Sequence, residues 1–207
     1  MTATRPATPP RRTRLSRDQR AEQLLDVAER LFADQGFEGT SMEDVARAAG
    51  VTRPVVYDHH ATKEDLFYSC VRRARRELED RLDALQPSGQ VDALADVLEC
   101  GGDAFFGILE RDPRRWAVLF NPSSALAEPL ARRLEDLRAG TIERIAAVAR
   151  RFAPDADPDR LGAYAHAISG VGEQLGRWWL TRPDVPRQQV VAYYRDFVVS
   201  GLTRARG

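Results

Sequence analysis

Apolar residues recur at helical spacing along almost the whole chain from Arg17 onward. In the first such stretch, about Ser16 to Gln35, one apolar stripe is followed by Gly36, which is typical of the end of a helix. Alternating runs of strand length are absent from the sequence, and no repeat of about 20–50 residues is visible. The pattern therefore predicts an all-α protein.

Two more short helices are predicted directly after the first. Thr40 and Glu43 fit a capping box, which opens a helix that ends at Gly50. Thr52 can cap a third helix, about Arg53–His59. Three short helices with a glycine-containing tight turn between the second and the third are typical of a helix-turn-helix, in which the third helix enters the major groove of DNA.

The rest of the chain predicts longer helices. Thr62 caps one that reaches about Leu85. Breaks that contain proline or glycine leave further helical spans at residues 90–111, 113–121, 123–152, 158–181 and 187–204. We therefore expect three parts: a flexible basic arm at 1–16, an N-terminal three-helix helix-turn-helix head at 17–61, and a larger C-terminal helical domain at 62–207.

The charges balance overall but not locally. With 31 basic and 31 acidic residues, the chain has no net field that draws it to nucleic acid or to a membrane. Residues 1–17 hold five arginines and no acid, whereas residues 18–60 hold four arginines and nine acids. The sequence leaves two interpretations of the arm open: it tracks DNA phosphates, or it is a solvated tail.

The cysteine content and the absence of long apolar runs indicate the cellular compartment of the protein. Cys70 and Cys100 cannot form a disulfide framework, and their positions on apolar faces favour the core over redox sensing. The sequence has no apolar run of membrane-spanning length, and its first residues lack the apolar stretch of a secretory signal. We therefore expect a cytoplasmic protein with no membrane partner.

The sequence lacks the motifs of the common catalytic sites and any nameable acid–base constellation, which predicts a protein that is not an enzyme and uses no cofactor. A metal site at His59 and His60 is not expected, because neighbouring helical residues point about 100° apart and no Cys or Asp completes the set. The arginine run at residues 72–76 is interpreted as a solvated helix face, with contact to flanking DNA as the alternative.

Side chains of the turn and the third helix are suited to DNA. Arg53 can donate paired hydrogen bonds to guanine, and Pro54 together with Val55 or Val56 can contact thymine methyl groups. Polar groups at helix ends can hold phosphates. The candidate DNA-contacting residues are Thr40, Ser41, Thr52, Arg53, Pro54, Val55, Tyr57, His59 and Lys63.

An ordered set of residues in this region matches a known family. The set is Ala28, Leu31, Phe32, Gly36, Phe37, Thr40, Ser41, Met42, Val45, Ala46, Ala49, Gly50, Val51, Thr52, Tyr57, His59, Lys63, Glu64 and Leu66. With it, the stretch from Arg20 to Val71, roughly a quarter of the chain, resembles the DNA-binding domain of the TetR family of transcriptional repressors. One departure is His60, which stands where the family usually has Phe. The other is the net acidic charge of residues 18–60.

The resemblance implies a homodimer that places two third helices in successive major grooves of a palindromic operator. It implies that Arg53, Pro54 and Val55 face bases. It also implies phosphate-backbone contacts for the residues at the helix ends, namely Thr40, Thr52, Tyr57, His59 and Lys63.

The helix predicted at 158–181 carries two neighbouring apolar stripes. One contains mostly small residues, and beside it run Leu161, Tyr164, Ile168, Val171, Leu175 and Trp178. We expect one stripe to meet the protein's own core and the other a partner subunit, with a monomer that buries both as the alternative. Together with the last helix, the predicted dimer interface is Gly162, Ala165, Ser169, Gly172, Gly176, Trp179, Tyr194, Phe197 and Val198.

A ligand pocket is expected among the helices of the second half, because the family commonly places one there. The candidate lining is Phe105, Trp116, Phe120, Tyr164 and His166, with an ordinary aromatic core as the alternative. The sequence thus favours a regulator, most simply a repressor that a small-molecule effector releases from double-stranded DNA. The alternatives are a helical small-molecule carrier or a dimeric adaptor whose helix-turn-helix is structural.

Overall fold

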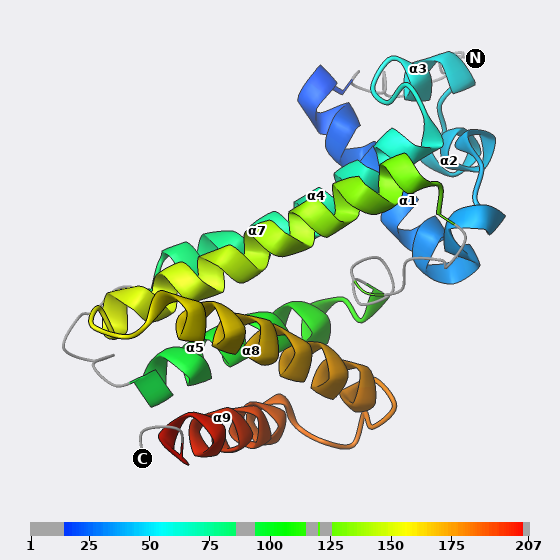
Figure 1. The fold of residues 1–207 in the computed structure, drawn as a ribbon. Helices are drawn as coiled ribbons and strands as arrows, with labels where there is room; N and C mark the ends of the chain where they lie inside the picture. Colours follow the sequence, from blue (N-terminus) through cyan, green and yellow to red (C-terminus); the bar gives the residue numbers. More distant parts are fainter. Residues whose placement is uncertain (1–14, 86–93, 115–119, 121–125, 205–207) are drawn as a thin grey trace, which may run out of the picture.

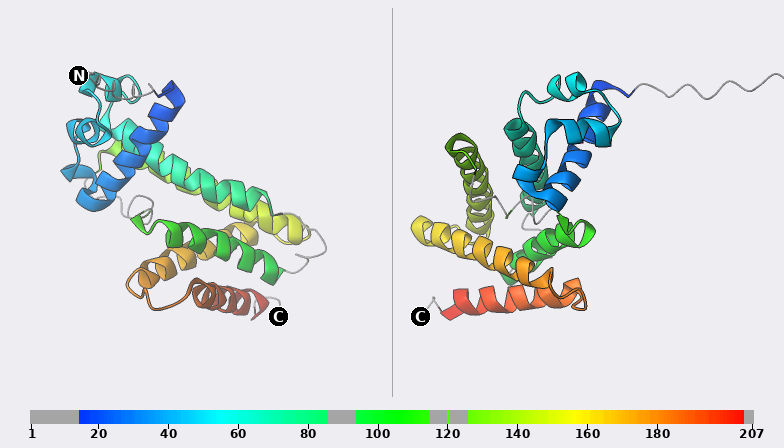
Figure 2. Two further views of the ribbon diagram at one scale, coloured as in Figure 1. Left: turned by 180° about the vertical axis from the view of Figure 1, so that it is seen from behind. Right: turned by 90° about the vertical axis from the view of Figure 1, so that its right-hand side faces the viewer.

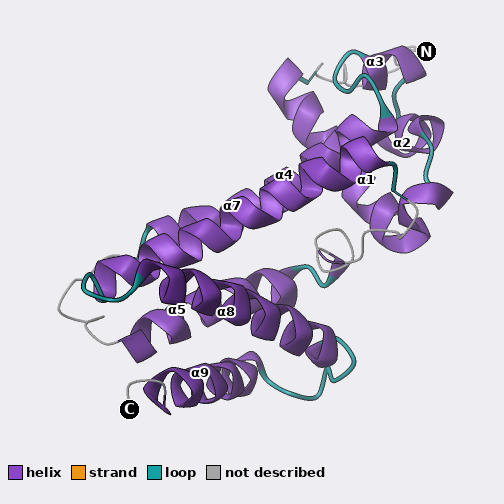
Figure 3. Cartoon of the chain, in the orientation of Figure 1, coloured by secondary structure: helices purple, strands orange, loops and turns teal. Residues whose placement is uncertain are grey.

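The computed structural model describes residues 15–85, 94–114, 120 and 126–204. Within these ranges the regular secondary structure is α-helical throughout (Figure 3), which confirms the all-α prediction. The helices are α1 Arg17–Gly39, α2 Met42–Ala49, α3 Arg53–Tyr57, α4 Lys63–Asp83, α5 Leu94–Arg111, α7 Glu128–Phe152, α8 Pro158–Trp179 and α9 Arg187–Arg204.

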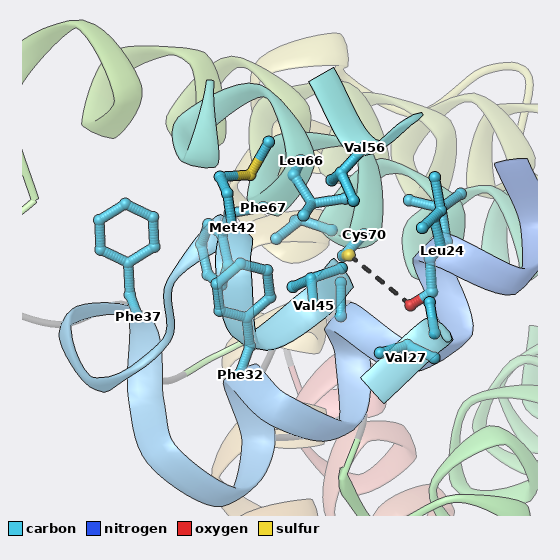
Figure 4. Close-up of a cluster of buried hydrophobic side chains, with 14 of the residues drawn as sticks. Leu24, Val27, Phe32, Phe37, Met42, Val45, Val56, Leu66, Phe67 and Cys70 are labelled. Carbon is cyan, nitrogen blue, oxygen red and sulfur yellow. Dashed lines mark hydrogen bonds between the residues drawn. The ribbon is translucent and has the colours of Figure 1, made fainter. Parts of the chain in front are cut away.

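The small head is built on one hydrophobic core to which α1, α2, α3 and the first half of α4 all contribute (Figure 4). Leu24, Val45, Val56 and Leu66, one from each of these helices, are fully buried. The Phe67 ring of α4 meets Phe32 and Phe37 of α1 edge-on, at centroid distances of 4.9 and 5.2 Å. Since α4 completes this core, the head's packing extends past residue 61, the end predicted for it.

Two positive-φ glycines shape the head. Gly36 has φ 74° and ψ 173°, so it interrupts α1 rather than ending it, and the helix resumes to Gly39. Gly50 has φ 64° and ψ 36° and closes α2 in the left-handed conformation that the tight turn before α3 requires. The predicted turn is therefore confirmed in its geometry.

The cap of α2 lies one residue later than predicted. Ser41 is the N-cap: the Asp44 amide donates to its hydroxyl at 3.1 Å, and the Asp44 carboxylate accepts from the Ser41 amide, also at 3.1 Å. Thr40 is only 2% exposed, and its hydroxyl donates to the Gly36 carbonyl at 2.9 Å. The capping box of Thr40 and Glu43 is thus wrong because burial of Thr40 leaves the neighbouring serine to cap.

Two long helices, α4 and α7, connect the larger body to the head. They lie side by side and run in the same direction away from the head (Figures 1 and 2). The Asp65–Arg133 ion pair, 2.9 Å, joins them near the head, and Asp83 pairs with Arg144 near the other end. Leu130, at the start of α7, is buried in the head's own core. Both helices therefore connect the head to the body.

Aromatic side chains pack together where α5, α8 and α9 meet in the body. Phe106 of α5 is fully buried, and its ring meets Trp179 of α8 at 5.9 Å and Tyr194 of α9 at 5.8 Å, both edge-on. A Cβ on Gly102 would lie 2.8 Å from the Tyr194 ring, so glycine at this position is what lets α5 and α9 approach so closely.

The small-residue stripe of α8 faces inward, which corrects the predicted dimer interface. Ala165, Gly172, Gly176 and Trp179 of α8 are buried, as are Tyr194 and Val198 of α9, while Gly162 and Ser169 are half-buried. A Cβ on Gly172 would touch the rings of Phe105 and Tyr194, so the small residues make room for the protein's own aromatic side chains. Of the predicted interface residues, Phe197 alone is exposed.

Candidate functional site

The α3 helix presents three exposed side chains, Arg53, Pro54 and Tyr57, on the surface of the head. The Arg53 Nη2 donates a hydrogen bond to the Tyr57 hydroxyl at 3.1 Å, and the guanidinium carbon lies 5.3 Å from the centre of the Tyr57 ring. This hydrogen bond raises the pKa of Arg53. The guanidinium is thus held against its own helix and keeps its charge in solvent.

The opposite side of α3 anchors it. Val56 is fully buried in the head's core, and Val55 is half-buried. Thr52, the N-cap residue, is exposed, and its hydroxyl makes no capping hydrogen bond. The structure therefore places Thr52, Arg53, Pro54 and Tyr57 together on the exposed side of α3.

Three of the predicted DNA-contacting residues make hydrogen bonds within the head itself. Thr40 is buried and donates to Gly36. The Lys63 Nζ donates to the Phe37 carbonyl at 3.0 Å and lies 4.2 Å from the centre of the Phe37 ring. Ser41 is exposed, but its hydroxyl is the cap of α2. Their polar groups fix the path of the chain between α1, α2 and α4.

A shallow groove separates the start of α1 from α3. Its residues are Leu15, Ser16, Arg17, Arg20, Val51, Val55, Asp58 and His59. His59 is half-buried and lines this groove together with Arg17 and Arg20 of α1. The predicted basic arm joins the described chain at this groove, next to α3.

The departure at His60 makes the edge of the head more polar. The side chain is half-buried, and its buried Nε2 has no hydrogen-bond partner among the residues that the structure describes. Burial lowers the pKa of this imidazole, with a smaller effect of His59 in the same direction. The neutral form is therefore favoured in the folded head.

Both cysteines are poorly suited to redox chemistry. Cys70 is fully buried, with its Sγ 4.0 Å from the Leu25 carbonyl oxygen, and burial raises the pKa of its thiol far above the usual value. Cys100 is half-buried, and burial raises its pKa as well. These environments agree with the expected structural roles.

The body contains a partly open cavity of about 90 Å³, several times the roughly 10–15 Å³ that admits one water molecule. Phe105 and Phe120, both predicted, line it, with ring centroids 5.9 Å apart. Trp116 lies outside the described residues. The other described residues that line it are Arg75, Leu78, Leu82, Leu85, Val97, Leu98, Gly101, Thr141, Ile145, Val148, Ala149, Ile168, Ser169, Gly172, Glu173 and Tyr194.

Tyr164 and His166 correct the predicted lining, because neither borders this cavity. His166 is exposed on α8. The Tyr164 hydroxyl accepts a hydrogen bond from Arg160 Nε at 2.8 Å, one turn earlier on the same helix. The helix is turned so that Ile168, Gly172 and their neighbours face inward.

The lining predicted from the sequence did not include the charged side chains of the cavity wall. Arg75 belongs to the arginine run that was interpreted as solvated, yet it is only 6% exposed. Its neighbour Arg73 is also drawn in, bridging Glu22, Asp26 and Glu29 of α1. The signal was present: Arg75, Leu78 and Leu82 share one helical stripe.

The charged residues of the cavity wall differ in how well their polar groups are paired. Glu173 pairs with Arg138 at 2.7 Å and accepts from Ser169 at 3.2 Å. With the described residues, Arg75 makes one long hydrogen bond, from Nη1 to the Thr141 hydroxyl at 3.4 Å, and its buried Nε has no partner among them. Burial lowers the pKa of Arg75 to about 10, so it still carries its charge at neutral pH.

An exposed apolar face lies on the outer side of α8 and α9. Trp178, Tyr193 and Phe197 are 38%, 45% and 68% exposed, and the first two rings meet edge-on at 6.4 Å. Together with Gly170, Val171, Gln174 and Leu175 they form a shallow groove. We call these seven residues the outer face.

Neither a metal centre nor a membrane segment emerges from the part of the chain that the structure describes. No group of three or more His, Cys, Asp or Glu there could hold a metal ion. No helix in these ranges is long and apolar enough to cross a bilayer.

Comparison with known proteins identifies relatives. A family model described as "Bacterial regulatory proteins, tetR family" matches residues 24–70. The HTH-type transcriptional activator FasR of Mycolicibacterium smegmatis is 34% identical over 123 residues, which cover 56% of this chain and 52% of FasR. The chain thus spans about half the length of FasR. The HTH-type transcriptional repressor KstR2 of the same organism is 25% identical over 205 residues, 91% of this chain and 93% of KstR2.

Solved structures show the same fold. A tetR-family transcriptional regulator from Streptomyces coelicolor superposes with a TM-score of 0.73 at 20% identity, covering 93% of this chain and 85% of that chain. The likeness extends through the helical body as well as the head.

Proposed function

Because the chain belongs to the TetR family of bacterial regulatory proteins, we propose that it is a homodimeric transcriptional regulator. In this proposal it binds a palindromic operator and represses transcription until a small molecule fills its cavity. The observation that carries the proposal is α3, whose exposed Arg53, Pro54 and Tyr57 stand opposite a fully buried anchor, Val56.

On DNA, α3 would lie in the major groove. Arg53 then donates to guanine O6 and N7, and Pro54 and Val55 contact thymine methyl groups. Thr52, Tyr57 and His59 border these residues and are placed to contact phosphates. The basic arm, which joins α1 beside α3, supplies the positive charge that the acidic head lacks.

The outer face supports the homodimer. Three exposed aromatic side chains on neighbouring helices are the composition that protein interfaces favour at their centres. A two-fold axis through such a face pairs α8 and α9 with their copies and presents two α3 helices on one side. This replaces the small-residue stripe with the adjacent stripe of Val171, Leu175 and Trp178 as the proposed contact.

Coupling between cavity and DNA would run through α4 and α7. Both helices line the cavity, and both enter the head's core, through Leu66 and Leu130. Arg133 of α7 also pairs with Asp65 and stacks on the Tyr68 ring at 4.0 Å. An effector that binds one arrangement of these helices better shifts the population of head spacings. Equal effector affinity for free and operator-bound protein would contradict this mechanism.

Arg53→Ala tests the function directly. We expect the full chain to enrich a palindrome from a randomised duplex pool, and the variant to bind that palindrome about 5- to 150-fold more weakly, with preference lost at one base position per half-site. Arg30→Ala, which removes the same charge from an exposed position of α1, is the control and should keep the preference. Failure of the full chain to enrich any sequence overturns the proposal and reopens the carrier and adaptor alternatives.

A further inference from the structure

From the cavity we infer the chemical class of the effector: an elongated amphipathic anion whose charged head binds Arg75 and whose apolar tail lies along α4 and α7. That this ligand acts as an effector rests on the proposed function. The binding site itself is defined by the side chains that line the cavity.

Among the described residues, Arg75 is a buried cation with no carboxylate within ion-pair distance, and its guanidinium carbon lies 5.8 Å from the centre of the Phe120 ring. It is 6% exposed, and within the described part of the chain its one hydrogen bond is long at 3.4 Å and its Nε has no acceptor. Buried arginines are otherwise almost always paired, because an unpaired buried charge is costly. The guanidinium therefore has donors to spare at the cavity wall, in a geometry that matches a carboxylate.

The acidic groups nearby are already engaged. Glu173 holds Arg138 and Ser169, and Glu79 accepts from the Thr141 hydroxyl at 2.9 Å and lies 3.4 Å from Arg144. A cationic ligand would have to displace one of these partners, whereas an anion completes Arg75. The charge of the ligand follows from this difference.

The polar groups gather at one end of the cavity. Of the lining residues on α4 and α7, Arg75 and Thr141 lie nearest the head, beside Phe120. Farther along the same helices the lining is apolar, with Leu78 and Leu82 on α4 and Ile145, Val148 and Ala149 on α7. The seven helical steps from Arg75 to Leu82 rise about 10 Å along the helix. The ligand's charged group thus lies toward the DNA-binding head and its tail points away from it.

Calorimetric titration of the full chain with matched alkyl compounds tests this class. Decanoate, 1-decanol and decyltrimethylammonium share one tail and differ in charge, and each is used as a monomer in solution. We expect decanoate to bind at least about tenfold more tightly than either of the others. Equal or tighter binding of the alcohol or the cation, or no binding of any of the three, overturns the inference, and this comparison needs no variant.

Arg75→Met removes the charge at similar length. We expect it to lose about tenfold or more in decanoate affinity while decanol binds at least as well as before, and to melt no lower than the parent, since an unpaired buried charge has been replaced by an apolar side chain. Arg72→Met, at an exposed position of α4, should change neither. Unchanged decanoate binding by folded Arg75→Met would overturn the assignment.

DNA selection on the same preparation separates the two proposals. A chain that enriches a palindrome but shows no preference for decanoate keeps the regulator and loses the inferred ligand class. A chain that binds decanoate through Arg75 but enriches no DNA keeps the ligand site and loses the regulator.

Discussion

Replacing Trp178 and Phe197 together with aspartate is expected to convert the protein to a monomer and to weaken operator binding by about 10²- to 10⁴-fold. Both side chains lie on the outer face, where they are 38% and 68% exposed in the single chain. A carboxylate buried without a partner at the centre of an apolar interface is strongly unfavourable. Without the dimer, the second α3 no longer binds as an intramolecular event. Sedimentation velocity and gel-shift titration measure the two effects.

The matched control places two aspartates elsewhere. Ala139 and Gly140 are exposed on α7, and a Cβ added at Gly140 meets no atom within 4 Å. We expect the double variant Ala139→Asp, Gly140→Asp to remain dimeric. If the Trp178, Phe197 variant sediments as a dimer and binds its operator like the parent, the outer face is not the subunit interface.

Phe106→Ala is expected to lower the free energy of unfolding by about 3–5 kcal/mol. The ring is fully buried and packs edge-on against Trp179 and Tyr194, so its removal leaves a cavity where α5, α8 and α9 meet. Urea denaturation at a fixed protein concentration measures the change, since the stability of a dimer depends on concentration.

Tyr57→Ala serves as the control for Phe106→Ala. Its ring is 40% exposed, so we expect a change within about 0.5 kcal/mol. A Phe106→Ala protein as stable as Tyr57→Ala would show that the three helices are not held by this aromatic cluster.

The head was largely predictable because its signals are local. The turn at Gly50, the anchoring of α3 and the apolar stripe of α1 all follow from residue type and spacing. The α2 cap was missed because Thr40 with Glu43 and Ser41 with Asp44 both satisfy a capping pattern. Only the burial of Thr40, which depends on how α1 folds back at Gly36, decides between them.

The body was less predictable because its faces are chosen by partners distant in sequence. The two stripes of α8 are neighbours on one helix, and which of their residues turn inward depends on side chains across the core, such as Phe105 and Tyr194 opposite Gly172. Spacing along α8 carries no information about those side chains. The same limit placed His166 in the cavity, although it is exposed.

The burial of Arg75 could have been predicted from its helical spacing, but the charge of the neighbouring arginines indicated an exposed position. Its spacing from Leu78 and Leu82 places it on the inward stripe, but its position in a run of arginines favoured a solvated face. Burial of one cation in such a run is uncommon, and here it marks the wall of the cavity.

The most direct test of the central claim is a titration of the selected duplex with the full chain across a series of salt concentrations, with the stoichiometry measured by sedimentation. We expect two chains per palindrome and a log affinity that falls steeply and linearly with log salt, because Lys and Arg contacts release counterions from phosphate. Binding that is independent of salt, or one chain per duplex, would contradict a dimer that reads DNA through paired α3 helices.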